Sequence, residues 1–149
     1  VTQQINRALA PGGVFYTFDY VGAPRLQWTD RQLFFANLVL KSLPDNYRRD
    51  LRGQVRQEIQ RVPSESLSPS EANYSDQILP AMAKHLDVKW QYNWAGLLYP
   101  LLEGIAFNFD ENKPEDRALI DHFFHFDRVL CQTREIIPNF TITLATKKS

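Results

Sequence analysis

The segment LAPGGVFYTFDYVG, at residues 9–22, decides the fold class that this sequence predicts. Ahead of it, Ile5 and Leu9 lie four residues apart, as apolar residues do on one face of a helix. The Pro-Gly-Gly at residues 11–13 ends that helix and turns the chain. The run Val14–Phe18 is nearly all apolar or β-branched, which is typical of a strand covered on both faces, as in a parallel sheet. Helix, glycine-rich turn and buried strand together predict an α/β fold.

Farther along the chain, local patterns predict more helices and two more strands. Thr29-Asp30-Arg31-Gln32 and Ser68-Pro69-Ser70-Glu71 both have the form of a capping box, which marks the start of a helix. We expect helices over residues 29–41, 45–61, 68–86, 96–109 and 114–135, the third either continuous or restarted at Ser75, and strands over 87–93 and 140–146. Three strands are few beside so many helices, because a typical sheet has about 5–6. The sequence therefore indicates part of a larger sheet.

The composition of the chain excludes some classes of binding partner. The 149 residues are most simply one domain, and 17 basic residues balance 17 acidic ones. A chain with no net charge lacks the basic excess of proteins that cover nucleic-acid backbones. A single cysteine cannot form an internal disulfide, so we expect a cytoplasmic protein. No apolar run reaches the roughly 20 residues of a membrane span, so we expect no membrane partner, just as the charge balance predicts no nucleic-acid partner.

Several longer motifs carry a resemblance to a known family. Their letters are LAPGG-VFYTFDYVG from Leu9, DYVG-x-x-RLQW from Asp19 to Trp28, SLP at residues 42–44, SPSEANYSDQIL at 68–79, GLLYPLLEGIAFNF at 96–109 and NFTITLATKK at the end. In this order they resemble the C-terminal, substrate-side half of a bacterial class I S-adenosylmethionine-dependent methyltransferase. The likeness covers nearly the whole chain.

The resemblance implies the C-terminal part of a Rossmann-like methyltransferase sheet, with three strands and a helix-rich cap. Residues 1–28 would be a helix, a turn and a buried strand; 29–86 a helical cap; and 87–149 a strand, two helices and a strand. The family's fifth, seventh and sixth strands lie side by side. The edge along Val14–Phe18 would then be unpaired, which implies a homo-oligomer or strand exchange through that edge.

The implied cofactor is S-adenosyl-L-methionine, yet the half of the fold that binds it is missing. The family's glycine-rich loop and the acidic residue that holds the ribose belong upstream of Val1. No segment here supplies G-x-G-x-x-G after a strand. We therefore expect no cofactor-binding residue in this chain, and an inactive protein when the chain is alone.

The first candidate substrate-binding residues follow the strand at 14–18. Asp19 and Tyr20 lie at its carboxyl end, where open α/β sheets form ligand crevices. Otherwise Asp19 only caps the strand and Tyr20 packs. Arg25 and Trp28 cluster before a helix, and a guanidinium beside an indole can hold a carboxylate or stack on a ring. Packing at the start of the helix is the alternative.

Three more candidates come from later motifs. Glu71 is an acid that could face a substrate, although as fourth residue of a capping box it has a structural role to fill. Trp94 and Tyr99, with Tyr92, flank Gly96 and could line an aromatic cavity. The alternative for these three aromatic residues is the hydrophobic core.

The remaining residues with reactive side chains are interpreted as structural or surface residues. His122 and His125 are three apart on one predicted helix, but no third ligand cluster is visible, so the segment HFFHF is interpreted as an aromatic helix face and no metal site is assigned. Cys131 has no base nearby in sequence, which favours a buried thiol. The arginines between residues 48 and 61 alternate with acids, as on a solvated surface.

The sequence thus leads to two functional hypotheses. The first, which the resemblance implies, is a part of a methyltransferase that transfers a methyl group to a small-molecule substrate, such as an aromatic or carboxylate-bearing acceptor. No catalytic residue is assigned, because methyl transfer depends mainly on alignment and desolvation. The second is a non-catalytic binding or assembly module that retains the half-fold.

Overall fold

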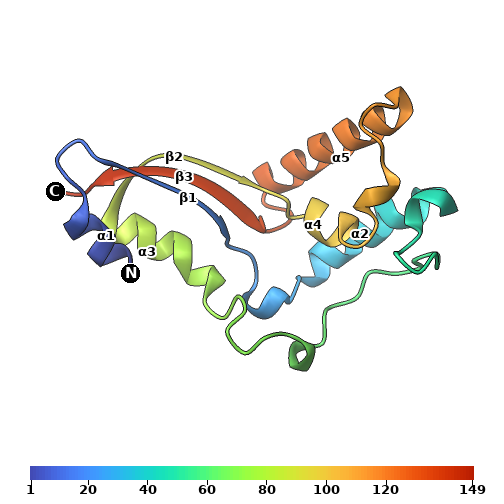
Figure 1. The fold of residues 1–149 in the computed structure, drawn as a ribbon, viewed down its shortest axis with the longest axis horizontal. Helices are drawn as coiled ribbons and strands as arrows, with labels where there is room; N and C mark the ends of the chain where they lie inside the picture. The colour runs from blue at the N-terminus through green and yellow to red at the C-terminus, as the bar shows by residue number, and fades with distance from the viewer.

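The computed structural model describes residues 1–149, except for the side chain of Ser64. It is an α/β structure whose three strands form one sheet in the order β1-β3-β2 (Figure 1). The strands are β1 (Val14–Tyr20), β2 (Leu86–Trp94) and β3 (Phe140–Lys147). The C-terminal strand lies in the centre and is antiparallel to both neighbours. The three predicted strands are therefore confirmed, and β1 is an edge strand.

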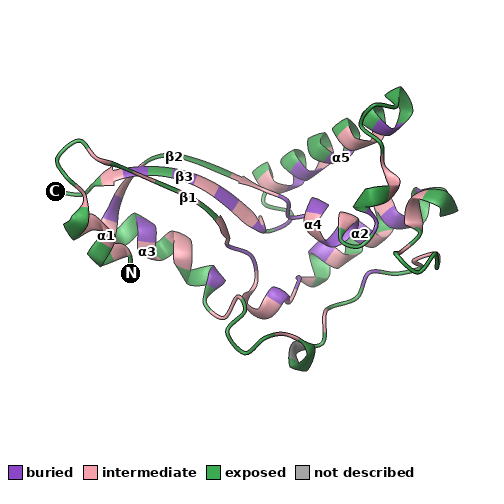
Figure 2. Ribbon diagram, viewed as in Figure 1, coloured by how far each residue is buried: buried purple, intermediate pink, exposed green. Residues whose placement is uncertain are grey.

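The two faces of the sheet differ in what covers them. Phe15 packs with Leu86 and Ala145 against α1 (Thr2–Ala8) and α3 (Ile78–His85), which lie under one face (Figure 1). On the opposite face, the alternate side chains Val14, Tyr16 and Phe18 are exposed (Figure 2). The expectation that β1 is buried on both faces is therefore wrong for residues 14–18; a helix meets this face at the end of the strand, where Tyr20 contacts Tyr99 of α4 (Leu98–Leu102).

Three further helices gather at the other end of the molecule (Figure 1). They are α2 (Asp30–Ser42), α4 (Leu98–Leu102) and α5 (Pro114–Gln132). The capping box that opens α2 is confirmed, since the Thr29 hydroxyl accepts from the Gln32 backbone while the Gln32 side chain accepts from the Thr29 backbone. No described helix is both long enough and apolar enough to cross a membrane.

One predicted helix is wrong and two others are shorter than predicted. Residues 45–61 contain no α-helix: a 3-10 turn lies at Asp45–Arg48, Arg49 and Val55 form an isolated antiparallel bridge, and the chain around Ile59 has no regular secondary structure. There the Asn37 side chain bonds both the N–H and the C=O of Ile59, as a neighbouring strand would. The second capping box opens a series of turns, and α3 begins only at Ile78. The segment 96–109 has one short helix, α4, which ends before Gly104 at φ +76°.

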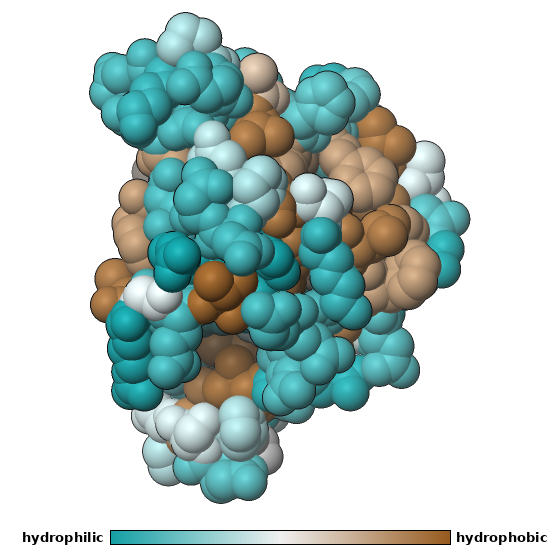
Figure 3. All heavy atoms as spheres, turned by 90° about the vertical axis from the view of Figure 1, so that its right-hand side faces the viewer, coloured by the Kyte–Doolittle hydropathy of each residue, from teal (hydrophilic) through white to brown (hydrophobic). Residues whose placement is uncertain are grey.

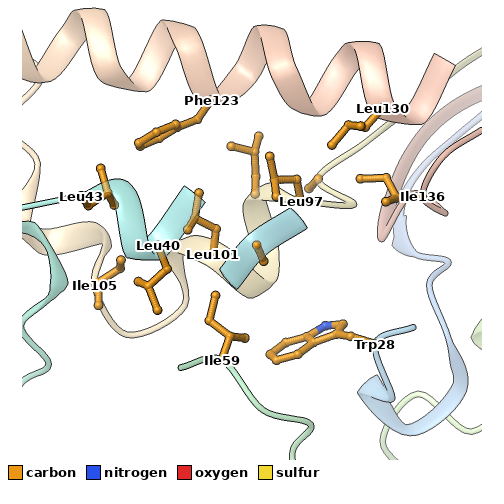
Figure 4. Close-up of a cluster of buried hydrophobic side chains, with 13 residues drawn as sticks. Trp28, Leu40, Leu43, Ile59, Leu97, Leu101, Ile105, Phe123, Leu130 and Ile136 are labelled. Atoms are coloured by element: carbon orange, nitrogen blue, oxygen red, sulfur yellow. The ribbon is translucent and has the colours of Figure 1, made fainter. Parts of the chain in front are cut away.

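The main hydrophobic core joins the three helices rather than the sheet. Side chains from α2, α4 and α5, among them Leu40, Leu101 and Phe123, point toward one another, with Trp28 and Ile59 below them (Figure 4). Figure 3 shows this end of the molecule from outside, where apolar side chains reach the surface in patches between hydrophilic ones. The large exposed apolar residues here include Phe34 and Leu38 of α2.

A buried polar network connects this core to the sheet. The Asp127 carboxylate of α5 accepts from the backbone N–H groups of Ala95, Leu97 and Leu98, at 2.8, 2.7 and 3.3 Å. The Asn139 amide, just before β3, donates to the Ala95 carbonyl at 2.8 Å. Every one of these polar groups is buried and paired, which holds the turn between β2 and α4 in one position.

Candidate functional site

A cavity of about 570 Å³ opens at the carboxyl end of β1. We call it the strand-end cavity. Its walls come from the end of β1, the start of β3, the turns before α3, and α4. The lining residues are Asp19, Tyr20, Leu26, Ser70, Glu71, Ala72, Asn73, Tyr74, Ser75, Ile78, Tyr99 and Phe140. The volume lies within the roughly 300–1,000 Å³ of small-molecule sites.

Three aromatic rings form one wall of the strand-end cavity. The Phe140 ring lies edge-on to Tyr20 and to Tyr99, with centroids 5.6 and 5.3 Å apart. Tyr20 and Tyr99 are themselves 6.2 Å apart in an edge arrangement. Antiparallel pairing places Tyr20 opposite Phe140, so the sheet register positions two of the three rings. Edge-to-face contacts of this kind fix ring orientation and stabilise the wall.

The hydroxyls of the two tyrosines remain protonated across the ordinary pH range. Burial, with the neighbouring Tyr99, raises the pKa of Tyr20 far above its usual 10.0. Burial also raises the pKa of Tyr99, helped by the negative charges of Glu103 and Glu71. The Tyr20 hydroxyl donates to the Ala23 carbonyl at 3.0 Å. Both phenols therefore act as hydrogen-bonding groups and not as bases at neutral pH.

Two carboxylates, Asp19 and Glu71, also line the strand-end cavity. The Asp19 carboxylate accepts a hydrogen bond from the Thr17 hydroxyl. Neither carboxylate forms an ion pair with a described lysine, arginine or histidine side chain. The lining contains no basic residue either. The lining of the cavity thus combines carboxylates with aromatic rings.

The backbone around the cavity holds several residues in a conformation that L-residues rarely adopt. Arg25 and Leu26 have φ of 59° and 54°, and Ala72 has φ of 50°. The Arg25 backbone N–H donates to the Ala72 carbonyl at 2.9 Å, which joins the two strained segments. Nearby, the Ser75 hydroxyl donates to the Gly22 carbonyl at 2.8 Å. Strained backbone of this kind concentrates at binding and catalytic sites.

Gly22 leaves room for the tyrosine wall. A Cβ atom at this position would lie 2.6 Å from the Tyr20 hydroxyl oxygen and 2.4 Å from the Asn139 side-chain oxygen. Both distances are far below ordinary contact. Any side chain at residue 22 would therefore push Tyr20 or Asn139 out of place, so glycine here is required by the site's geometry.

Four of the predicted substrate-binding residues meet in the cavity. They are Asp19, Tyr20, Glu71 and Tyr99. Glu71 is exposed and lies in a turn, so its alternative role in a helix-capping box is not realised.

Arg25, Trp28 and Trp94 do not line the strand-end cavity. The Arg25 guanidinium donates to the Ser68 carbonyl at 2.6 Å, which ties down the turn. Trp28 is 1% exposed and stands edge-on behind Tyr99, with centroids 6.0 Å apart. Trp94 stacks on Phe124 at 6.1 Å. The predicted carboxylate-holding pair of Arg25 and Trp28 is therefore not assembled, since the indole belongs to the core.

Other lining residues gave no signal in the sequence. Phe140 begins a predicted strand with nothing that marks it as a site residue, and Asn73 and Ser75 belong to a motif that predicts a helix. The register of β1 with β3 would have been needed to place Phe140.

Two further features of the sequence concern the histidines and the cysteine of α5. Among the described residues, no group of three or more His, Cys, Asp and Glu side chains is arranged to hold a metal ion. Burial, with the negative charge of Asp127, raises the pKa of Cys131 to about 12. A thiol with that pKa is almost entirely protonated at neutral pH and is a poor nucleophile.

Comparison with protein-family models, with curated proteins and with solved structures finds no match to this chain.

Proposed function

We propose that this chain is the acceptor-binding part of an S-adenosylmethionine-dependent methyltransferase. The observation that carries the proposal is the strand-end cavity, which gathers Asp19, Tyr20, Glu71 and Tyr99 at the carboxyl end of β1. The sheet order β1-β3-β2, with β3 antiparallel to both neighbours, supports it. The motif resemblance implies the same order for the last strands of the methyltransferase sheet.

In this proposal the cavity positions a small acceptor, and the cofactor is held by polypeptide outside the 149 residues. The methyl group passes from the sulfonium to the acceptor by in-line displacement, so the protein contributes alignment and exclusion of water. The rigid aromatic wall of Tyr20, Tyr99 and Phe140 supplies alignment. A carboxylate of the lining, Asp19 or Glu71, supplies a proton acceptor if the acceptor atom loses a proton.

The test begins with the coding sequence upstream of Val1. The proposal expects a strand followed by a glycine-rich loop there, and the product of the whole coding sequence is expected to bind S-adenosylmethionine at micromolar concentration in a calorimetric titration. The chain of 149 residues alone is expected to show no such binding. A start of translation close to Val1, or micromolar binding by this chain alone, would contradict the proposal.

A second candidate function is supported by the exposed face of β1. Val14, Tyr16 and Phe18 are 63, 60 and 51% exposed on an edge strand. An apolar edge strand is a template for pairing with another chain. Under this alternative the half-fold is a non-catalytic assembly module, and a second copy or a partner strand adds to β1. Self-association without any methyl-transfer activity in the product of the whole coding sequence would favour it.

A further inference from the structure

From the chemistry of its walls, we infer that the strand-end cavity binds a small organic cation: a protonated amine attached to an aromatic or apolar body. Calling this ligand the methyl acceptor rests on the proposed function; its binding to the cavity does not.

The first support is the sign of the charge in the cavity. Asp19 and Glu71 both contribute carboxylates to the lining, which contains no lysine, arginine or histidine. Neither carboxylate is neutralised by an ion pair with a described side chain. Glu71 also lies close enough for its negative charge to raise the pKa of the Tyr99 phenol. An ammonium group is therefore attracted to the cavity, and a carboxylate or phosphate is repelled.

The basic side chain of Arg25, which bonds the lining residue Asn73, does not reverse this preference. The Arg25 guanidinium is directed to the Ser68 carbonyl, at 2.6 Å, and to the Asn73 side-chain oxygen, at 3.5 Å. Arg25 is outside the lining. The guanidinium bonds the turn that contains Ser68 and Asn73 and does not line the cavity. Arg25 is therefore not placed to hold an anion inside it.

The second support is the aromatic wall. Tyr20, Tyr99 and Phe140 hold one another edge-on at 5.3 to 6.2 Å. Aromatic faces attract cations through the ring quadrupole, and they also pack well against an apolar ligand body. Tyr74, which is 71% exposed, adds a fourth ring to the lining. A lining with both carboxylates and aromatic rings suits a ligand with one cationic end and one apolar body.

The third support is that the residues forming the cavity are already held in place. The Arg25 N–H to Ala72 C=O bond and the Ser75 hydroxyl to Gly22 C=O bond join the turns to the end of β1. Leu26 and Ala72, both at positive φ, lie in the lining itself. A preformed cavity lowers the entropic cost of binding a small ligand.

The experiment uses the 149-residue chain and compares three probes of similar size: one cationic, one neutral and one anionic. The probes are 2-phenylethylammonium, neutral 2-phenylethanol and 3-phenylpropanoate, each titrated at pH 7 and followed by chemical-shift changes in the protein's NMR spectrum. We expect the ammonium probe to bind at least about tenfold more tightly than the alcohol, with shifts at Tyr20, Tyr99 and Phe140. We expect no saturable binding of the propanoate. Added salt should weaken the ammonium probe more than the alcohol.

Matched variants separate charge from folding. Asp19→Asn and Glu71→Gln should each weaken the ammonium probe several-fold while leaving the alcohol within about twofold. Glu58→Gln, the same change at an exposed residue outside the lining, should leave both probes unchanged. The inference is overturned if no probe binds, if the propanoate binds as tightly as the ammonium probe, or if the two cavity variants affect both probes equally. These titrations contain no cofactor, so a failed methyl-transfer assay leaves their result standing.

Discussion

The backbone N–H of Arg25 donates to the carbonyl of Ala72 at 2.9 Å, and both residues have positive φ, 59° and 50°. One residue follows β1 and the other lies in the turns before α3, so this bond joins two distant segments at the cavity. Each residue adopts an unfavourable backbone conformation in order to make the contact. The bond therefore identifies where tertiary structure overrides local preference in this protein.

The strain at Ala72 predicts a stabilising substitution. Ala72→Gly should raise the free energy of unfolding by up to about 1 kcal/mol, because glycine adopts positive φ without a Cβ clash. The matched control is Ala83→Gly on an exposed, regular turn of α3, which should lower it by about 1 kcal/mol. Urea unfolding followed by circular dichroism measures both. Destabilisation by Ala72→Gly equal to that of the control would show that residue 72 is not strained.

The Asp127 network predicts a large loss of stability. Asp127→Ala leaves the N–H groups of Ala95, Leu97 and Leu98 without their acceptor in a buried place, so the free energy of unfolding should fall by about 3 kcal/mol or more. Asp121→Ala, at an exposed position of the same helix, should change it by less than about 1 kcal/mol. Equal effects of the two substitutions in urea unfolding would contradict this role for Asp127.

The same carboxylate predicts a pH dependence. Burial raises the pKa of Asp127 above its ordinary 3.8, against the lowering effect of its three backbone hydrogen bonds. The folded state then holds its proton more tightly than the unfolded state. The stability from this group is fully present below pH 3.8 and is lost as the pH rises through the higher, folded-state pKa. Wild type should therefore lose stability relative to Asp127→Asn as the pH rises above about 4. A difference that grows in favour of wild type over that range would contradict the sign.

Cys131 should be slow to react in the folded protein. Its pKa of about 12 leaves very little thiolate at pH 8, and its side chain is only partly exposed. With a disulfide reagent such as dithiobisnitrobenzoate, we expect a rate at least about a hundredfold below that of the same chain in denaturant. Comparable rates in the two conditions would mean that the fold neither buries the thiol nor raises its pKa.

The edge strand predicts self-association of the chain at high concentration. Tyr16→Lys places a charge on the exposed face of β1 and should shift the protein toward monomer in sedimentation velocity. The control is Leu38→Lys, at an equally exposed apolar residue on α2, which should leave the association unchanged. A wild-type chain that stays monomeric at high concentration would argue against pairing through β1.

Local signals explain which elements the sequence could predict. The capping box of Thr29 and Gln32 acts within four residues, and it opens α2 as expected. The β-branched run at the C-terminus forms β3 because its alternation suits a pleated strand. The helix predicted over 45–61 failed because its apolar stripe was thin, with one anchor per turn. Contacts of Ile59 with Asn37 and of Tyr47 with Asp116 hold that segment in another conformation.

By itself, the sequence determined the three strands, the two longest helices and the absence of a charge excess, because periodicity and composition are properties of neighbouring residues. It also pointed to Asp19, Tyr20, Glu71 and Tyr99. Only the tertiary structure decided that these four meet in one cavity while Trp28 does not. The physical reason is that the sheet register and the hydrogen bond between two strained turns set which side chains converge. Both depend on contacts between residues far apart in the chain.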